Sequence, residues 1–116
     1  MSYVDGVVIP VPDANKEKYR AKAAEMAAIF KKHGASQVVE CWSNDVHDGE
    51  TTSFHLAVQR KDDESIVFSW IMWPSKDVRD KAWEKIMAEG NMFAPGEMPF
   101  DGKRLIYGGF DVIVEA

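Results

Sequence analysis

The chain has 116 residues, 46% of them hydrophobic, which suits a single domain over residues 1–116 with one modest core. Acidic residues outnumber basic ones by 19 to 14, and the net charge of −5 argues against nucleic acid as a partner. A single cysteine, Cys41, excludes an internal disulfide and a cysteine-only zinc site, as is usual in a reducing cytosol.

The same composition predicts a soluble protein of the cytoplasm. The N-terminus lacks the basic start and the apolar run of a signal peptide. No apolar stretch approaches the ~18 residues that a bilayer-spanning helix needs. We therefore expect no membrane partner.

The first third of the chain predicts a strand and then a helix. Tyr3 to Pro10 is rich in β-branched residues and ends at prolines, as strands do. From Lys16 to His33 apolar residues recur at helical spacing, and Asp13 or Asn15 can cap the start of this helix. Gly34 can end it in a left-handed conformation.

Two further strands are predicted in the middle of the chain. The first, Ser36 to Trp42, is followed by a polar loop. The segment Phe54 to Arg60 fits either a helical turn or the start of a strand. Ile66 to Trp73 has seven apolar side chains out of eight without alternation, which is typical of a strand buried on both faces.

The last third predicts a second helix and a fourth strand. The helix starts after a cap at Ser75, carries an apolar stripe that includes Met87, and ends at Gly90. Residues 91–102 form a long connection, and Arg104 to Glu115 form the strand. Its Gly108-Gly109 pair predicts a bulge or a close approach to the backbone.

This order of elements predicts an α+β, ferredoxin-like βαββαβ fold. Right-handed crossovers place both helices on one face of a four-stranded antiparallel sheet. The other face is too apolar for an ordinary monomer. We therefore expect a homodimer in which two sheets pack face to face, a dimeric α+β barrel.

Several segments resemble the YbaA-like family of small bacterial proteins of unknown function. They are Tyr3-Val4-Asp5-Gly6, Val39-Glu40-Cys41-Trp42, Phe68-Ser69-Trp70-Ile71, Trp73-Pro74-Ser75-Lys76, Pro99-Phe100-Asp101-Gly102-Lys103-Arg104 and Ile106-Tyr107-Gly108-Gly109-Phe110. The resemblance runs nearly end to end and implies the dimeric α/β-barrel superfamily, but no established activity or catalytic residue. Some family members are linked to signal recognition particle RNA, so an RNA-associated role is a distant alternative that the acidic composition does not support.

Polar residues within the predicted strands are the candidates for chemistry. A buried carboxylate needs partners or a shifted pKa, so Glu40 and Asp5 are candidate acid or base residues, with Arg104 as a possible partner of Glu40. The candidate ligand-binding residues are Trp42, Ser69, Trp70, Trp73, Tyr107 and Arg104. Alternatively, Asp5 lies near a strand end in solvent and the tryptophans make core or dimer contacts.

The sequence predicts no metal site and no cofactor. Aligned on Gly49 as a calcium loop, the chain has Val46 and His55 where oxygen ligands are required. A solvated acidic loop is the better interpretation of the segment with His47. The basic residues of the second helix alternate with acidic ones, which indicates a solvated helix face. Cys41 is interpreted as a buried, inert thiol.

Two functional hypotheses remain open. In the first, the barrel is a binding module or a cofactorless enzyme that holds an apolar or aromatic small molecule between sheet and helices. In the second, it is a non-catalytic structural or interaction dimer. A pocket of ~300 Å³ or more that Glu40 reaches favours the first, and Glu40 paired with an arginine in a solid core favours the second. The sequence does not determine whether the protein is an enzyme.

Overall fold

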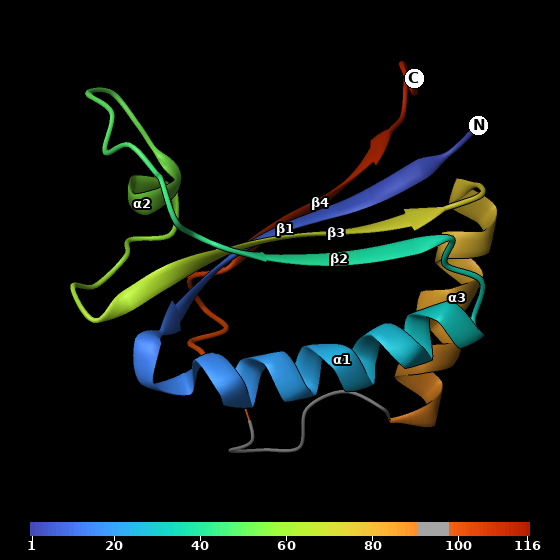
Figure 1. The fold of residues 1–116 in the computed structure, drawn as a ribbon. Helices are drawn as coiled ribbons and strands as arrows, with labels where there is room; N and C mark the ends of the chain where they lie inside the picture. Colours follow the sequence, from blue (N-terminus) through green and yellow to red (C-terminus); the bar gives the residue numbers. More distant parts are fainter. Residues whose placement is uncertain (91–97) are drawn as a thin grey trace.

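The computed structural model describes residues 1–90 and 98–116, and its elements follow the predicted order (Figure 1). They are β1 (Tyr3–Pro12), a short 3-10 helix η1 (Asp13–Asn15), α1 (Lys16–Lys32), β2 (Gln37–Trp42), α2 (Phe54–Ala57), β3 (Glu64–Trp73), α3 (Lys76–Glu89) and β4 (Ile106–Asp111). The predicted α+β, ferredoxin-like fold is confirmed. Part of the predicted 91–102 connection, residues 91–97, lies outside the described residues.

The four strands form one antiparallel sheet in the order β2-β3-β1-β4. In the register of this sheet, Glu40 pairs with Ser69, Ser69 with Val7, and Val7 with Tyr107. These four side chains therefore form one row across all the strands. Because side chains alternate along a strand, they all lie on the same face of the sheet.

Helices α1 and α3 both cover that face, as predicted (Figure 1). Tyr19, Met26 and Phe30 are the buried residues of α1, at the spacing of one helix face. Ala82 and Ile86 play the same part in α3. The predicted stripe is wrong at Met87, which is 62% exposed because it lies beyond the face that meets the sheet.

The predicted ends of α3 are confirmed; α1 starts at Lys16 as predicted, but without the predicted side-chain cap. The Val78 amide donates to the Ser75 hydroxyl at 3.2 Å, and Gly90 adopts a left-handed φ of 68°. Neither Asp13 nor Asn15 caps α1 with its side chain. They lie in η1, a turn before α1, where Asp13 accepts from the Ser65 hydroxyl and Asn15 donates to the Pro99 carbonyl.

Strand β4 is shorter than predicted and has no bulge. Pairing with β1 is continuous through Gly108 and Gly109 and ends where Asp111 meets Tyr3, the first residue of β1, so the chain beyond has no strand to pair with. The alternative reading of the glycine pair is confirmed. A Cβ on Gly109 would lie 2.3 Å from the Tyr3 hydroxyl, so only glycine leaves room for that ring.

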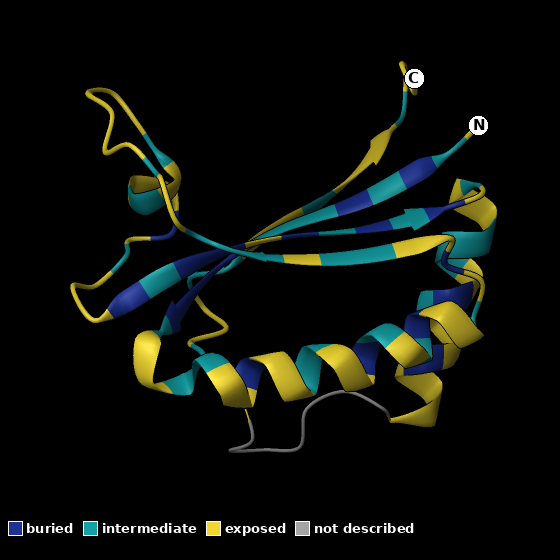
Figure 2. Ribbon diagram, viewed as in Figure 1, coloured by how far each residue is buried: buried dark blue, intermediate teal, exposed yellow. Residues whose placement is uncertain are grey.

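From Val67 to Trp73, buried residues of β3 alternate with more exposed ones (Figure 2). Val67, Ile71 and Trp73 face the helices and are at most 4% exposed, whereas Phe68 on the other face is 45% exposed. From Val67 to Trp73, β3 is therefore buried mainly on the face that meets the two long helices, whereas Ile66, on the other face near the start of the strand, is also buried.

By strand alternation the sheet side away from α1 and α3 includes Pro10, Pro12, Glu64 and Ile66 at one end, of which Pro10, Glu64 and Ile66 are buried. The rest of this side carries no charged side chain. Its residues are Val4, Gly6, Val8, Gln37, Val39, Cys41, Phe68, Trp70, Met72, Ile106, Gly108 and Phe110. We call these twelve positions the open face. At one end the short helix α2 lies on the same side of the sheet (Figure 1), and its Phe54 ring packs 6.0 Å from Phe68. The ambiguous 54–60 segment is thus a helical turn.

Candidate functional site

A cavity of about 580 Å³ lies between the sheet and helices α1 and α3. Most of its wall is apolar or aromatic and comes from Val7, Ile9, Ala23, Met26, Phe30, Ile71, Trp83, Phe100, Leu105 and Tyr107. The polar side chains that line it are Asp5, Tyr19, Glu40, Ser69, Arg79 and Asp80. An apolar pocket with a few converging polar groups is the usual form of a small-molecule site.

Glu40 is held by two hydroxyl donors at the cavity wall. The Tyr19 phenol donates to Oε1 at 2.5 Å, and the Ser69 hydroxyl donates to Oε2 at 2.7 Å. Burial of Tyr19, together with the negative charge of Glu40, raises the pKa of the phenol well above its usual range. Tyr19 therefore remains a proton donor to Glu40 at any physiological pH.

Two expectations about Glu40 are wrong. The residue is exposed, because β2 is an edge strand and only α1 approaches that edge. Its partners are Tyr19 and Ser69, whereas Arg104 pairs with Glu64 at 2.6 Å. The Arg104 guanidinium also binds Asp101 and the Gln59 carbonyl, so it takes no part in the cavity.

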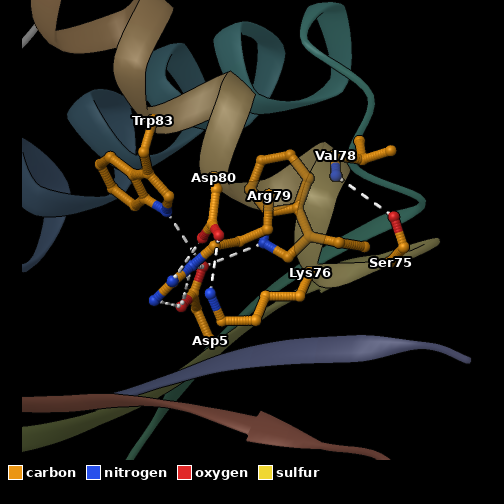
Figure 3. Close-up of polar contacts among 8 residues, drawn as sticks. Asp5, Ser75, Lys76, Val78, Arg79, Asp80 and Trp83 are labelled. Carbon is orange, nitrogen blue, oxygen red and sulfur yellow. Dashed lines mark hydrogen bonds and ion pairs between the residues drawn. The ribbon is translucent and has the colours of Figure 1, made fainter.

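Asp5 lies at the opposite end of the cavity in a dense polar cluster (Figure 3). Its carboxylate accepts from Nε and Nη2 of Arg79 at 3.0 and 2.8 Å, and from the indole N–H groups of Trp73 and Trp83 at 2.9 and 3.0 Å. The hydrogen bonds to Asp5 raise the pKa of Arg79. Asp5 is 6% exposed, so its predicted alternative as a solvated strand-end residue is wrong.

Arg79 is the main residue that the sequence interpretation misplaced. It was expected on the solvated face of the second helix, but its side chain is only 23% exposed and reaches back to β1. Arg79 stands three residues before Ala82 and four before Trp83, so it borders the apolar stripe of α3. That spacing was the available signal.

The structure divides the other candidate residues among several places. Ser69 and Tyr107 line the cavity, and Tyr107 is 80% exposed. Trp73 is fully buried and reaches the site only through Asp5. Trp70 lies on the open face and donates to Gln37, so it does not wall the cavity. Trp42 lines a second cavity of about 260 Å³ between α1 and β2, which shares Tyr19, Ala23 and Glu40 with the first.

The histidines, the cysteine and the other acidic residues are the remaining candidates for a metal centre. Within residues 1–90 and 98–116, no three His, Cys, Asp or Glu side chains converge as metal ligands do. His55 bonds Asp48 at 2.9 Å, and His47 is exposed. Cys41 is half-buried, contrary to expectation, because it lies on the open face of an edge strand.

In the described part of the chain, no helix is both long and apolar enough to cross a bilayer.

Comparison with known proteins places the chain in a family. Residues 2–102 match the family model described as "Protein of unknown function (DUF1428)". The chain belongs to the DUF1428 family. It is also 53% identical to "Uncharacterized protein YbaA" of Escherichia coli strain K12, over 99% of each chain. This confirms the resemblance that the sequence motifs indicated.

Solved structures share the DUF1428 chain's fold at low sequence identity. A variant of SnoaB, a cofactor-independent oxygenase from Streptomyces nogalater, matches with a TM-score of 0.57 and 16% identity over 98% of this chain and 95% of that one. A variant of MhuD with two manganese protoporphyrin IX bound per active site matches with a TM-score of 0.62 and 13% identity, over 98% and 97% of the two chains. At these identities the likeness shows the fold alone.

The Glu64–Arg104 pair of this DUF1428 chain predicts a pH-dependent contribution to stability. Hydrogen bonds from Arg104 lower the pKa of Glu64, whose side chain is 4% exposed. A lowered folded-state pKa stabilises the fold above the unfolded pKa, and the contribution disappears as pH falls through the folded value. We expect Arg104→Gln to lower the free energy of unfolding by about 3 kcal/mol at neutral pH.

This expectation is checked by urea unfolding of both proteins between neutral pH and the acid limit. The gap between wild type and Arg104→Gln should narrow as pH falls below the usual pKa of a glutamate. Lys103→Gln, which removes a neighbouring exposed charge, is the control. If the difference in unfolding free energy between the two proteins stays constant to the lowest pH tested, the Glu64–Arg104 pair does not make this pH-dependent contribution.

Proposed function

We propose that this protein binds an apolar or aromatic small molecule in the cavity between the sheet and helices α1 and α3, and that it does so as a homodimer. The observation that carries the proposal is the cavity itself. Its volume of about 580 Å³ is in the range of ligand pockets, and both Glu40 and Ser69 line it. A solid core with Glu40 paired to an arginine would have favoured a purely structural protein instead.

Among the described residues, five aromatic rings line the cavity and support an aromatic ligand. They belong to Tyr19, Phe30, Trp83, Phe100 and Tyr107. Planar rings in such a wall offer stacking and edge contacts. A cofactor-independent oxygenase and a porphyrin-binding protein share this fold, which is consistent with a ligand site between the layers.

Glu40 is the better of the two predicted acid or base residues. Asp5 already accepts four N–H donors, two from Arg79 and two from indoles, and is occupied as a structural anion. Glu40 accepts one hydroxyl on each oxygen and keeps free lone pairs. If the protein converts its ligand, Glu40 is the residue positioned to take a proton from it.

The open face supports the proposed homodimer. Phe68 on the central strand β3, and Ile106 and Phe110 on the edge strand β4, are each exposed by 45% or more and form part of one apolar surface. Two-fold pairing of identical faces normally risks opposing like charges, and the open face has none. A second copy is therefore a better occupant than a charged partner such as RNA. The single cysteine and the bacterial relatives support a bacterial cytoplasm as the place of action.

A thermal-shift screen with a panel of apolar aromatic compounds tests the binding function. A ligand present at 100 times its dissociation constant stabilises the folded state by about 2.7 kcal/mol, which raises Tm by several degrees. Ala23→Phe is the matched control, because Ala23 lines the cavity and a phenyl group there would fill it. Compounds that stabilise wild type should not stabilise Ala23→Phe. Equal shifts in the two proteins would place binding elsewhere.

A further inference from the structure

The charges around the cavity limit what kind of ligand it can accept. Of its described lining residues, Asp5, Glu40 and Asp80 are acidic and only Arg79 is basic. Lys76 pairs with Asp80 at 2.7 Å and Arg79 pairs with Asp5, so an excess of one negative charge remains, at Glu40. This carboxylate repels an anionic ligand at its end of the cavity.

Arg79 does not offset this excess for a ligand. Its Nε and Nη2 donate to Asp5, and its Nη1 donates to Asp80 at 2.9 Å. Three of the five guanidinium N–H groups are therefore engaged, and its positive charge is paired with two carboxylates. An anion that displaced Asp5 would leave a nearly buried carboxylate without its partner, which is strongly unfavourable.

Glu40 is a pre-positioned acceptor at the other end of the cavity. Each carboxylate oxygen can accept two hydrogen bonds, and Tyr19 and Ser69 use one on each. The two hydroxyl donors fix the orientation of the carboxylate and leave acceptor positions open. A ligand N–H or O–H that reaches Glu40 would form a charge-assisted hydrogen bond.

The sheet register gives the span of the cavity along one row of side chains. Glu40 and Tyr107 stand at opposite ends of one row that crosses β2, β3, β1 and β4. Three inter-strand spacings separate them, about 14 Å. A fused two-ring aromatic is shorter than this span, so with its donor at Glu40 its rings would lie beside Phe100, which packs 6.0 Å from the Tyr19 ring. A cationic form would also gain cation–π attraction there.

We propose that the ligand is a neutral or cationic aromatic molecule with an N–H or O–H donor, that Glu40 accepts this hydrogen bond, and that anionic aromatics are excluded. The inference rests on the proposed binding function and adds the charge and polarity of the ligand to it.

Four naphthalene probes of matched size test the inference by calorimetric titration of wild type near neutral pH. They are 1-naphthylmethylamine, a cation; 1-naphthol, a neutral donor; 1-methoxynaphthalene, which lacks a donor; and 1-naphthoate, an anion. We expect the amine and the naphthol to bind at least about tenfold more tightly than the methoxy compound, because only they reach Glu40 with a donor. The naphthoate should bind most weakly of the four.

Two variants separate Glu40 from the net charge of the protein. Glu40→Gln should weaken binding of the amine at least about tenfold and leave the affinity for the methoxy compound unchanged. Glu84→Gln, an outward-facing position on α3, removes the same charge and should change no affinity. If Glu40→Gln does not fold, the wild-type ranking of the four probes decides alone.

The possible outcomes separate a failure of this inference from a failure of the proposed binding function. Equal affinities for all four probes, or tightest binding of the naphthoate, overturn the inference and leave the binding function standing. Equal weakening of the amine by Glu84→Gln and Glu40→Gln overturns the role of Glu40. If no naphthalene binds wild type, the inference and the proposed function both fail.

Discussion

Replacing Asp5 with asparagine is expected to lower the free energy of unfolding by about 3 kcal/mol or more. The isosteric change keeps the packing but leaves the Arg79 guanidinium without its main counter-ion at a site where the Asp5 side chain is only 9% exposed. It also places an amide where Trp73 and Trp83 both donate to one carboxylate oxygen. Breaking one side of a buried ion pair is among the most costly single substitutions.

Urea unfolding followed by tryptophan fluorescence measures this loss. Asp80→Asn is the matched control, because it touches the same guanidinium with a carboxylate whose side chain is 43% exposed. We expect its effect to be much smaller, as for exposed ion pairs generally. If Asp5→Asn and Asp80→Asn unfold at the same urea concentration, the cluster shown in Figure 3 is not a stabilising anchor of α3 on the sheet.

Replacing Phe68 and Trp70 together with lysines is expected to raise the dissociation constant of the homodimer by at least about 100-fold, or roughly 2.8 kcal/mol. Both residues lie in the middle of the open face, where their rings pack 5.6 Å apart. In a face-to-face dimer the lysines of both copies would be desolvated beside one another. In a monomer they would simply extend into water.

Sedimentation velocity at micromolar concentration separates these outcomes. Wild type should sediment at twice the mass of the chain and the double variant at the mass of one chain, with unchanged circular dichroism. Met87→Lys, which removes an exposed apolar side chain from α3 on the other side of the molecule, should remain dimeric. A wild-type monomer would refute the proposed assembly directly.

The sequence predicted most of the fold because the relevant signals are local. Helical spacing of apolar residues, the Ser75 cap and the Gly90 stop depend on neighbours within a few positions, and the structure has α3 where they placed it. The errors arise where a contact with a distant part of the chain replaces the expected local one. The Asp13 side chain bonds Ser65 instead of capping α1, because β3 lies close to it in the folded chain.

The candidate site was predicted less completely because its contacts are distant in sequence. Glu40 and Asp5 were recognised as carboxylates in strands, but their partners were not. Tyr19 is 21 residues from Glu40, and Arg79 is 74 residues from Asp5. Tyr19 was interpreted as part of an apolar stripe, and nothing in the sequence shows that its hydroxyl would reach across to β2.

The sequence by itself determined the order of the elements, the side of the sheet that the helices cover and the excess of apolar surface on the other side. These follow from periodicity and from the handedness of chain crossovers, which are properties of short segments. Only the tertiary structure decided that Arg104 binds Glu64 while Arg79 binds Asp5, and that a cavity lies between Glu40 and Tyr107. Ion-pair choice and cavity shape depend on how α1, α3 and the sheet settle against one another, and that packing is a property of the whole chain.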